Sequence, residues 1–183
     1  EATSDPAQAT WQRAAASYGR DEVIATELEY VARAAGQRGA NAEAAAAWRR
    51  AAMLSTTPGG RVRRLVRAIE PACRAGLTTE AINIVDEAEP LATGLDDLVE
   101  LATARFTLGV TAGVAVPAIA DLLSLADRLA DADTPEHHLA RVNLVAAAAA
   151  QCRMHGLDEG DRHLVADSLH RLEVLDHDLC DIA

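Results

Sequence analysis

The sequence predicts an all-α protein, a single helical-repeat domain over residues 1–183, and three observations lead to this prediction. The chain contains 41 alanines and one phenylalanine, a composition that favours closely packed helices over a β-sandwich or barrel. Helix-starting and helix-ending residues alternate at the spacing of helices joined by short loops. Gly39, Gly76 and Gly113 are spaced 37 residues apart, which indicates a repeated helix-turn-helix unit.

Capping residues, glycines and prolines predict nine helices in order along the chain. They span about 5–19, 21–37, 41–54, 57–76, 78–90, 95–108, 116–129, 134–156 and 161 to near the C-terminus. Asp5-Pro6, Thr57-Pro58 and Thr134-Pro135 combine a cap with a proline in the first turn. Asn41 and either Thr78 or Thr79 are the expected caps of the third and fifth helices. Pro71 lies inside the fourth helix and is expected to kink it.

The residues that follow the three glycines repeat as well. At five, nine and twelve residues after each glycine come a small residue, a large one and a small or aliphatic one: Ala44, Ala81, Ala118; Trp48, Val85, Leu122; Ala51, Ala88, Leu125. The register extends backwards to Ala7, Trp11 and Ala14. Small residues let helix axes approach closely, and the large residue fills the space between successive units. One unit alone cannot bury its apolar face, so the units are expected to stack.

This pattern, Gly-x4-Ala-x3-(Trp or aliphatic)-x2-Ala, resembles the tetratricopeptide repeat. The resemblance covers residues 25–55, 62–92 and 99–129, and half a unit at 7–18. It implies a right-handed superhelix of about four helix hairpins, with the first helix of each hairpin on the concave face. The period of 37 exceeds the usual 34, and Ala or Leu occupies most aromatic and glycine positions of the first helix.

The resemblance also implies which residues face the concave groove. They are mostly polar and mixed in charge: Thr26, Glu29, Arg33, Gln37, Arg63, Val66, Glu70, Arg74, Glu100, Thr103 and Thr107. Such a groove suits an acidic peptide or a small anion as ligand or partner. An ordinary solvated helix face is the alternative explanation of the same residues.

A narrower resemblance concerns residues 31–58, continued by Gly60-Arg61-Val-Arg-Arg-Leu65 and Cys73-Arg-Ala-Gly76. This stretch looks like the region downstream of the ATPase module in large ATP-binding LuxR-type transcriptional regulators of actinobacteria, and the arginine-only, alanine-rich composition fits a high-GC genome. The resemblance covers about residues 7–130 and carries no catalytic residue. It implies a regulatory segment, excerpted from a longer chain, that senses an inducer or a partner and contacts other domains of the same regulator.

A different class of function fits the same repeats. A self-standing tetratricopeptide-like adaptor that binds peptides would show the same helices without an ATPase or DNA-binding flank. The chain itself contains neither a Walker motif nor a C-terminal DNA-reading helix pair. An upstream Walker motif in the same reading frame would favour the regulator, and a start codon near Glu1 would favour the adaptor.

Composition excludes several kinds of chemistry. All 17 basic residues are arginine, so a P-loop lysine, a Schiff-base lysine and a Ser-Lys dyad are absent. We therefore expect no enzyme activity, no cofactor and no ATP binding. The net charge of −11 argues against nucleic acid as a partner, although Arg61, Arg63, Arg64, Arg67 and Arg74 make the fourth helix basic.

The remaining sequence features predict a cytoplasmic location. Three cysteines without CxxC spacing fit a reducing compartment. No apolar run reaches the roughly 18 residues of a membrane helix, and the N-terminus lacks a signal peptide.

The last predicted helix carries two further candidates. His163, Asp167 and His170 share one face and are weak candidates for zinc ligands of a metal-dependent enzyme, the least favoured function; a solvated acidic face is the alternative. A heptad seam on the same helix predicts a homodimer through residues 161–183. Its two positions are occupied by Val165, Leu172, Leu179 and by Ser168, Leu175, Ile182.

Overall fold

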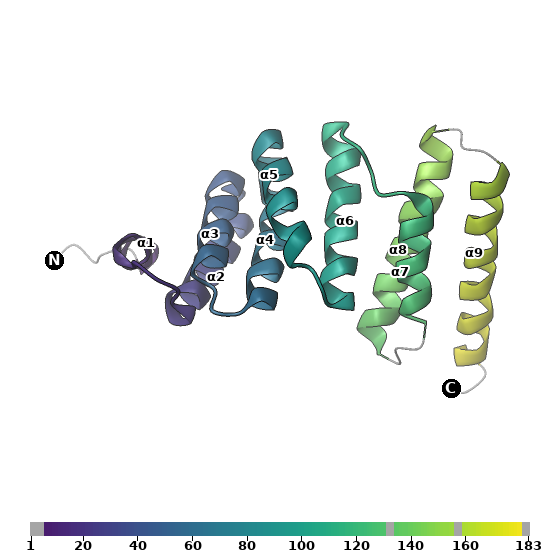
Figure 1. Cartoon of the computed structure of the whole chain (residues 1–183), viewed down its shortest axis with the longest axis horizontal. Coiled ribbons are helices and arrows are strands. Elements are labelled where there is room, and N and C mark those ends of the chain that lie inside the picture. Colours follow the sequence, from purple (N-terminus) through teal and green to yellow (C-terminus); the bar gives the residue numbers. More distant parts are fainter. Residues whose placement is uncertain (1–5, 131–133, 156–158, 181–183) are drawn as a thin grey trace. The chain divides into compact units, whose positions relative to one another are not determined.

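The computed structural model describes residues 6–130, 134–155 and 159–180, of which His155 and 173–180 are described by their backbone only. Within these ranges the chain is entirely helical, so the predicted all-α class is confirmed (Figure 1). The helices are α1 (Pro6–Ala16), α2 (Glu22–Gln37), α3 (Asn41–Leu54), α4 (Pro58–Arg74), α5 (Thr78–Ala88), a 3-10 turn η1 (Glu89–Leu91), α6 (Leu95–Ala112), α7 (Ile119–Arg128), α8 (Pro135–His155) and α9 (Glu159–Cys180). None of the described helices is long and apolar enough to cross a membrane.

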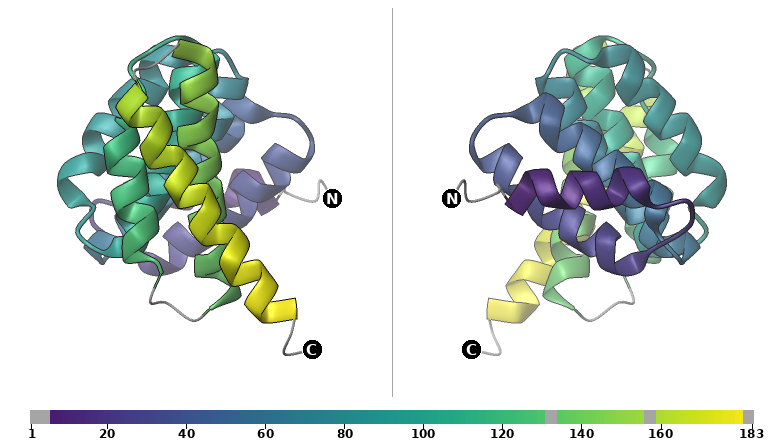
Figure 2. Two further views of the ribbon diagram at one scale, coloured as in Figure 1. Left: turned by 90° about the vertical axis from the view of Figure 1, so that its right-hand side faces the viewer. Right: turned by 90° about the vertical axis from the view of Figure 1, so that its left-hand side faces the viewer.

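Contacts between residues group the chain into two compact units, residues 1–115 and 116–183. In the first unit α2 packs on α3, α3 on α4, and α4 on both α5 and α6. Helix α1 packs against α2 and faces the viewer in the right-hand picture of Figure 2. In the second unit α7, α8 and α9 pack against one another, with α9 in front in the left-hand picture.

Side-chain caps begin three of the helices. Asp21 Oδ1 accepts a hydrogen bond from Ile24 N at 3.0 Å at the start of α2, and Thr57 Oγ1 accepts one from Gly60 N at 3.1 Å at the start of α4. Thr134 Oγ1 accepts from His137 N at 3.3 Å at the start of α8. Each of these bonds satisfies a first-turn N–H that has no partner inside its helix.

The caps predicted at Asn41 and at Thr78 or Thr79 are wrong. The N-caps of α3 and α5 are Ala40 and Leu77, and neither cap uses a side chain. The carbonyls of Ala40 and Leu77 accept from Ala44 N and Ala81 N, each at 2.9 Å, so the helical hydrogen bonds begin one residue earlier than predicted.

The turns after Gly39 and Gly76 have the same geometry. Their φ angles are 76° and 74°, in the left-handed region that favours glycine. Gly39 N donates to Gly36 O at 3.0 Å and Ala40 N to Ala35 O at 2.9 Å. The equivalent bonds 37 residues later, from Gly76 N to Cys73 O and from Leu77 N to Ala72 O, measure 3.0 and 2.9 Å. The predicted period is thus present in the backbone of these two turns.

The core uses the same repeat positions in these two hairpins. Ala44 and Ala81 are fully buried, and so are Ala51 and Ala88. Trp48 and Val85, at the large position, are 5% and 6% exposed. The first unit's largest fully buried side chains lie on α2, α3, α4 and α5: Leu28, Leu54, Val62, Leu65, Ile69 and Ile84.

The third predicted unit departs from the pattern. Gly113 also has a positive φ of 68°, but its N–H donates to Gly109 O, and α7 begins only at Ile119 rather than at 116. Ala118, the expected counterpart of Ala44, is the exposed N-cap of α7. The Pro117 carbonyl accepts a hydrogen bond from Gln151 Nε2 at 2.8 Å, and this bond anchors the segment outside the helix.

Candidate functional site

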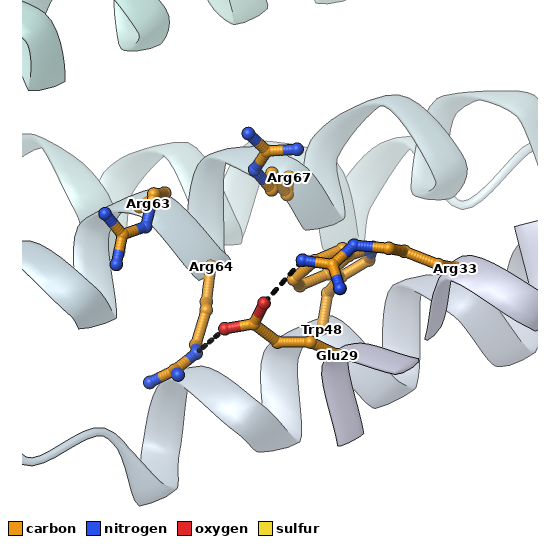
Figure 3. A pocket seen from close by; sticks show the side chains of 6 residues that line it. All are labelled: Glu29, Arg33, Trp48, Arg63, Arg64 and Arg67. Carbon is orange, nitrogen blue, oxygen red and sulfur yellow. Dashed lines mark hydrogen bonds and ion pairs between the residues drawn. The ribbon is translucent and has the colours of Figure 1, made fainter. Parts of the chain in front are cut away.

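A pocket of about 230 Å³ opens in the first unit among α2, α3 and α4 (Figure 3). Its lining is polar and rich in arginine: Glu29 and Arg33 from α2, Trp48 from α3, and Arg63, Arg64 and Arg67 from α4. The lining therefore consists of four guanidinium groups, one carboxylate and one indole.

Three of the predicted groove residues meet in this pocket. Glu29 and Arg33 lie one turn apart on α2, and Arg63 approaches them from α4. Arg63 lies 30 residues beyond Arg33 in the sequence and was linked to Glu29 and Arg33 only through the repeat register. The structure therefore places them on one continuous surface.

The other predicted groove residues do not line the pocket. Glu70 and Arg74 bond each other at 2.7 Å on the exposed surface of α4. The hydroxyls of Thr103 and Thr107 donate to the carbonyls of Val99 and Thr103 in their own helix, α6. Gln37 is the exposed last residue of α2.

Arg64 is the buried arginine of the pocket, with 3% of its side chain exposed. All three of its nitrogens donate hydrogen bonds: Nε to Glu29 Oε1 at 2.8 Å, Nη1 to Ser55 Oγ at 2.6 Å and Nη2 to Glu22 Oε1 at 2.6 Å. These four residues form what we call the Arg64 network. These bonds use three of the five N–H groups of Arg64 and connect α2, the end of α3 and α4 through one buried side chain.

The Arg64 network keeps its members charged. The hydrogen bond from Arg64 and the one from the Thr56 backbone N–H lower the pKa of Glu22 from 4.5 to about 2. Burial alone would lower the pKa of Arg64, but its hydrogen bonds to Glu22 and Glu29 outweigh this effect and raise the pKa above its ordinary value. Two carboxylates against one guanidinium give the network a net charge of −1.

Trp48 of α3 contacts two arginines from different helices, Arg33 of α2 and Arg67 of α4. The Cζ atoms of Arg33 and Arg67 lie 5.4 and 5.9 Å from the centre of the Trp48 ring, within the range of cation–π attraction. Arg33 Nη2 also donates to Glu29 Oε2 at 2.6 Å. The indole, itself buried, thus positions two guanidinium groups at the pocket.

Arg63 and Arg67 differ from Arg64 in their partners. Both are exposed, and neither forms an ion pair with any acidic residue in the described part of the chain. The pocket and the Arg64 network together hold four guanidinium groups and the carboxylates of Glu22 and Glu29, a surplus of two positive charges. In a chain with net charge −11, this is a local concentration of positive charge.

Sequence reasoning named Arg64 and Arg67 only as members of a basic helix and Trp48 only as a core residue. A usable indication existed: Glu22 and Glu29 are seven residues apart, hence on one face of α2, and face a helix that is rich in arginine. Which arginine they would select depends on how α2 lies against α4, and the sequence does not contain that information.

The predicted metal ligands do not form a site. His163, Asp167 and His170 are exposed on α9, and His163 Nε2 lies 4.0 Å from Glu159 Oε1. Over residues 6–130, 134–155 and 159–180 no group of three or more His, Cys, Asp or Glu side chains is arranged to hold a metal ion.

The predicted dimer seam is partly used inside the second unit. Helix α9 packs on α7 and α8, and Val165 and Ser168 are buried while Leu172 is half-buried. The side chains of Leu175 and Leu179, and all of Ile182, lie outside the described residues. The homodimer through 161–183 remains a prediction.

Comparisons with known proteins add no relative to this picture. No family model matches the chain, and no curated protein or solved structure shows significant similarity to it.

Proposed function

We propose that this chain is a non-catalytic regulatory and interaction segment of a cytoplasmic LuxR-type transcriptional regulator. In this proposal its hairpins form a right-handed tetratricopeptide-like superhelix of about four units, and a ligand or partner binds on the concave face. The identical turns after Gly39 and Gly76 support the repeat assignment.

The observation that carries the proposal is the meeting of Glu29, Arg33 and Arg63 in one pocket. If α2 and α4 are the first helices of successive hairpins, residues at groove positions on both should face the same side. A molecule bound there touches two hairpins at once. Its binding energy can therefore change how the two hairpins pack, which is the physical requirement for passing a signal along a repeat array.

The chemistry of the pocket supports binding rather than catalysis. Its one carboxylate, Glu29, already accepts hydrogen bonds from Arg64 and Arg33. Its other charged groups are guanidiniums, which stay protonated and cannot act as general bases at neutral pH.

The test uses the complete gene product that contains this chain. We expect it to hydrolyse ATP, to bind DNA and to activate a reporter gene in its host. An Arg63→Glu, Arg67→Glu double variant should change reporter output about tenfold or more, while ATP hydrolysis and DNA binding are retained.

The matched control is an Arg20→Glu, Arg38→Glu variant, which makes the same charge change at exposed arginines outside the pocket and outside the predicted groove. Its reporter output should stay within about twofold of wild type. A gene product without ATPase and DNA-binding activity, or equal effects of both variants, would contradict the proposal.

A further inference from the structure

We propose that the pocket binds the phosphate group of a small phosphorylated metabolite, with Arg63 and Arg67 as its main ligands and Arg33 as a third. This inference rests on the proposed function, because it names the class of ligand for the same site. Arg63 and Arg67 are two neighbouring arginines that form no ion pair with a carboxylate of the described chain.

The first step concerns Arg63 and Arg67. They are four residues apart on α4, so their side chains are neighbours on one helix face. Like charges at this spacing repel, and no carboxylate of the described chain pairs with either guanidinium. Trp48 then brings the guanidinium of Arg33 to the same ring as that of Arg67. An anion bound among the three removes this repulsion.

The second step compares ligand charge with pocket charge. The surplus of two positive charges matches a phosphate monoester, which carries about −1.5 to −2 at neutral pH. A single carboxylate would leave the surplus half neutralised. Guanidinium groups also bind phosphate oxygens through two parallel N–H bonds, a geometry that lysine does not offer.

The third step uses the size of the pocket. Its volume of about 230 Å³ lies below the ~300–1,000 Å³ of sites for drug-sized ligands. A phosphate with a short polyol fits this space better than a nucleotide or a peptide does. Glu29 supports the polyol, because each of its oxygens has one donor in the structure and a lone pair left for a ligand hydroxyl.

The experiment titrates the 183-residue chain with glycerol 3-phosphate and with inorganic phosphate at about 50 mM salt, where screening of an open site is modest. Calorimetry measures binding, and tryptophan fluorescence of a Trp11→Phe variant reports on Trp48, the indole that contacts Arg33 and Arg67. We expect saturable binding of glycerol 3-phosphate, tighter than that of inorganic phosphate, with a change in Trp48 fluorescence.

An Arg63→Ala, Arg67→Ala variant should weaken binding by about tenfold or more. Both side chains are exposed, so its circular dichroism and melting temperature should match wild type. An Arg20→Ala, Arg38→Ala variant removes the same charge at exposed positions outside the pocket and the predicted groove and should bind as wild type does.

Three results would overturn the inference. They are no saturable binding of either phosphate up to about 10 mM, equal loss in both double variants, and binding of a phosphoserine or glutamate-rich peptide without binding of glycerol 3-phosphate. The reporter assay is independent of these titrations. If glycerol 3-phosphate fails while the Arg63→Glu, Arg67→Glu variant still alters reporter output, the proposed function stands and only the ligand class is wrong.

Discussion

The two compact units join their helices by different means. In the first unit a buried guanidinium, Arg64, bonds to three residues from α2 and the α3–α4 connection. In the second unit the ion pair between helices that the structure describes joins Arg171 Nη2 to Asp127 Oδ1 at 3.4 Å, with both side chains about half exposed. Buried charge pairs constrain geometry strongly, whereas exposed pairs contribute little. The first unit thus contains a buried ion-pair network that connects its helices.

The turns that begin at the three positive-φ glycines of the first unit also differ from one another. A helix follows Gly39 and Gly76 after one intervening residue, but five residues separate Gly113 from α7. All three glycines have the same left-handed φ. A glycine in this conformation thus ends a helix without determining that a closely packed hairpin follows.

The largest expected effect tests the contrast in ion pairs. Arg64→Ala should lower the free energy of unfolding by about 2–4 kcal/mol, because it leaves Glu29, Ser55 and Glu22 without their shared donor. Arg171→Ala, which removes only a surface pair, should cost about 0.5 kcal/mol or less. Urea unfolding measures both values, and similar losses would erase the distinction between the units.

The next effect tests the repeat positions. Ala44→Leu and Ala81→Leu should each cost about 1–3 kcal/mol, because both alanines are fully buried between helices. Ala118→Leu should change stability by no more than about 0.5 kcal/mol, since Ala118 is exposed. Thermal melts of the three variants suffice. A loss of stability at Ala118 as large as at Ala44 would mean that the repeat after Gly113 packs like those after Gly39 and Gly76.

These positions also show which features of the fold could be predicted from the sequence. Spacing alone predicted the buried Ala44 and Ala81 and the turns at Gly39 and Gly76, because a periodic core leaves a periodic pattern. Ala118 fits the same pattern and is exposed, because it precedes α7 as its N-cap, next to the Pro117 carbonyl that accepts a hydrogen bond from Gln151. In the pocket, the sequence indicated the charges of α4 but not which arginine would be buried, since that choice depends on the approach of α2.

A smaller effect sharpens the comparison of the turns. Gly39→Ala, Gly76→Ala and Gly113→Ala should each cost about 1 kcal/mol, because all three have positive φ while no neighbouring atom blocks a Cβ. Gly36→Ala, inside α2 with open space around it, should instead stabilise by about 0.5–1 kcal/mol. Chemical denaturation resolves the opposite signs. If Gly113→Ala alone were neutral, the turn at Gly113 would differ in conformation from those at Gly39 and Gly76.

The smallest effect is a pH dependence of the first unit. Folding lowers the pKa of Glu22 from 4.5 to about 2, so its contribution is present above pH 4.5 and is lost as the pH falls towards 2. Because 43% of this side chain is exposed, screening limits the contribution to about 1 kcal/mol. The stability difference between wild type and Glu22→Gln should shrink across this window, as followed by melting at several pH values. A difference that stays constant with pH would contradict this role of Glu22.

The Arg64 network also determines what kind of motion α2 can make. Glu22 and Glu29 both bond to the one guanidinium of Arg64, so this point is a pivot between α2 and α4. Sliding of α2 along α4 would break both bonds, whereas a small rotation about the pivot keeps them. Gln37 lies eight residues beyond Glu29, about 12 Å along the helix axis, so a rotation of about 10° moves the end of α2 by about 2 Å. Such a rotation would carry Arg33, four residues beyond Glu29, in the same direction.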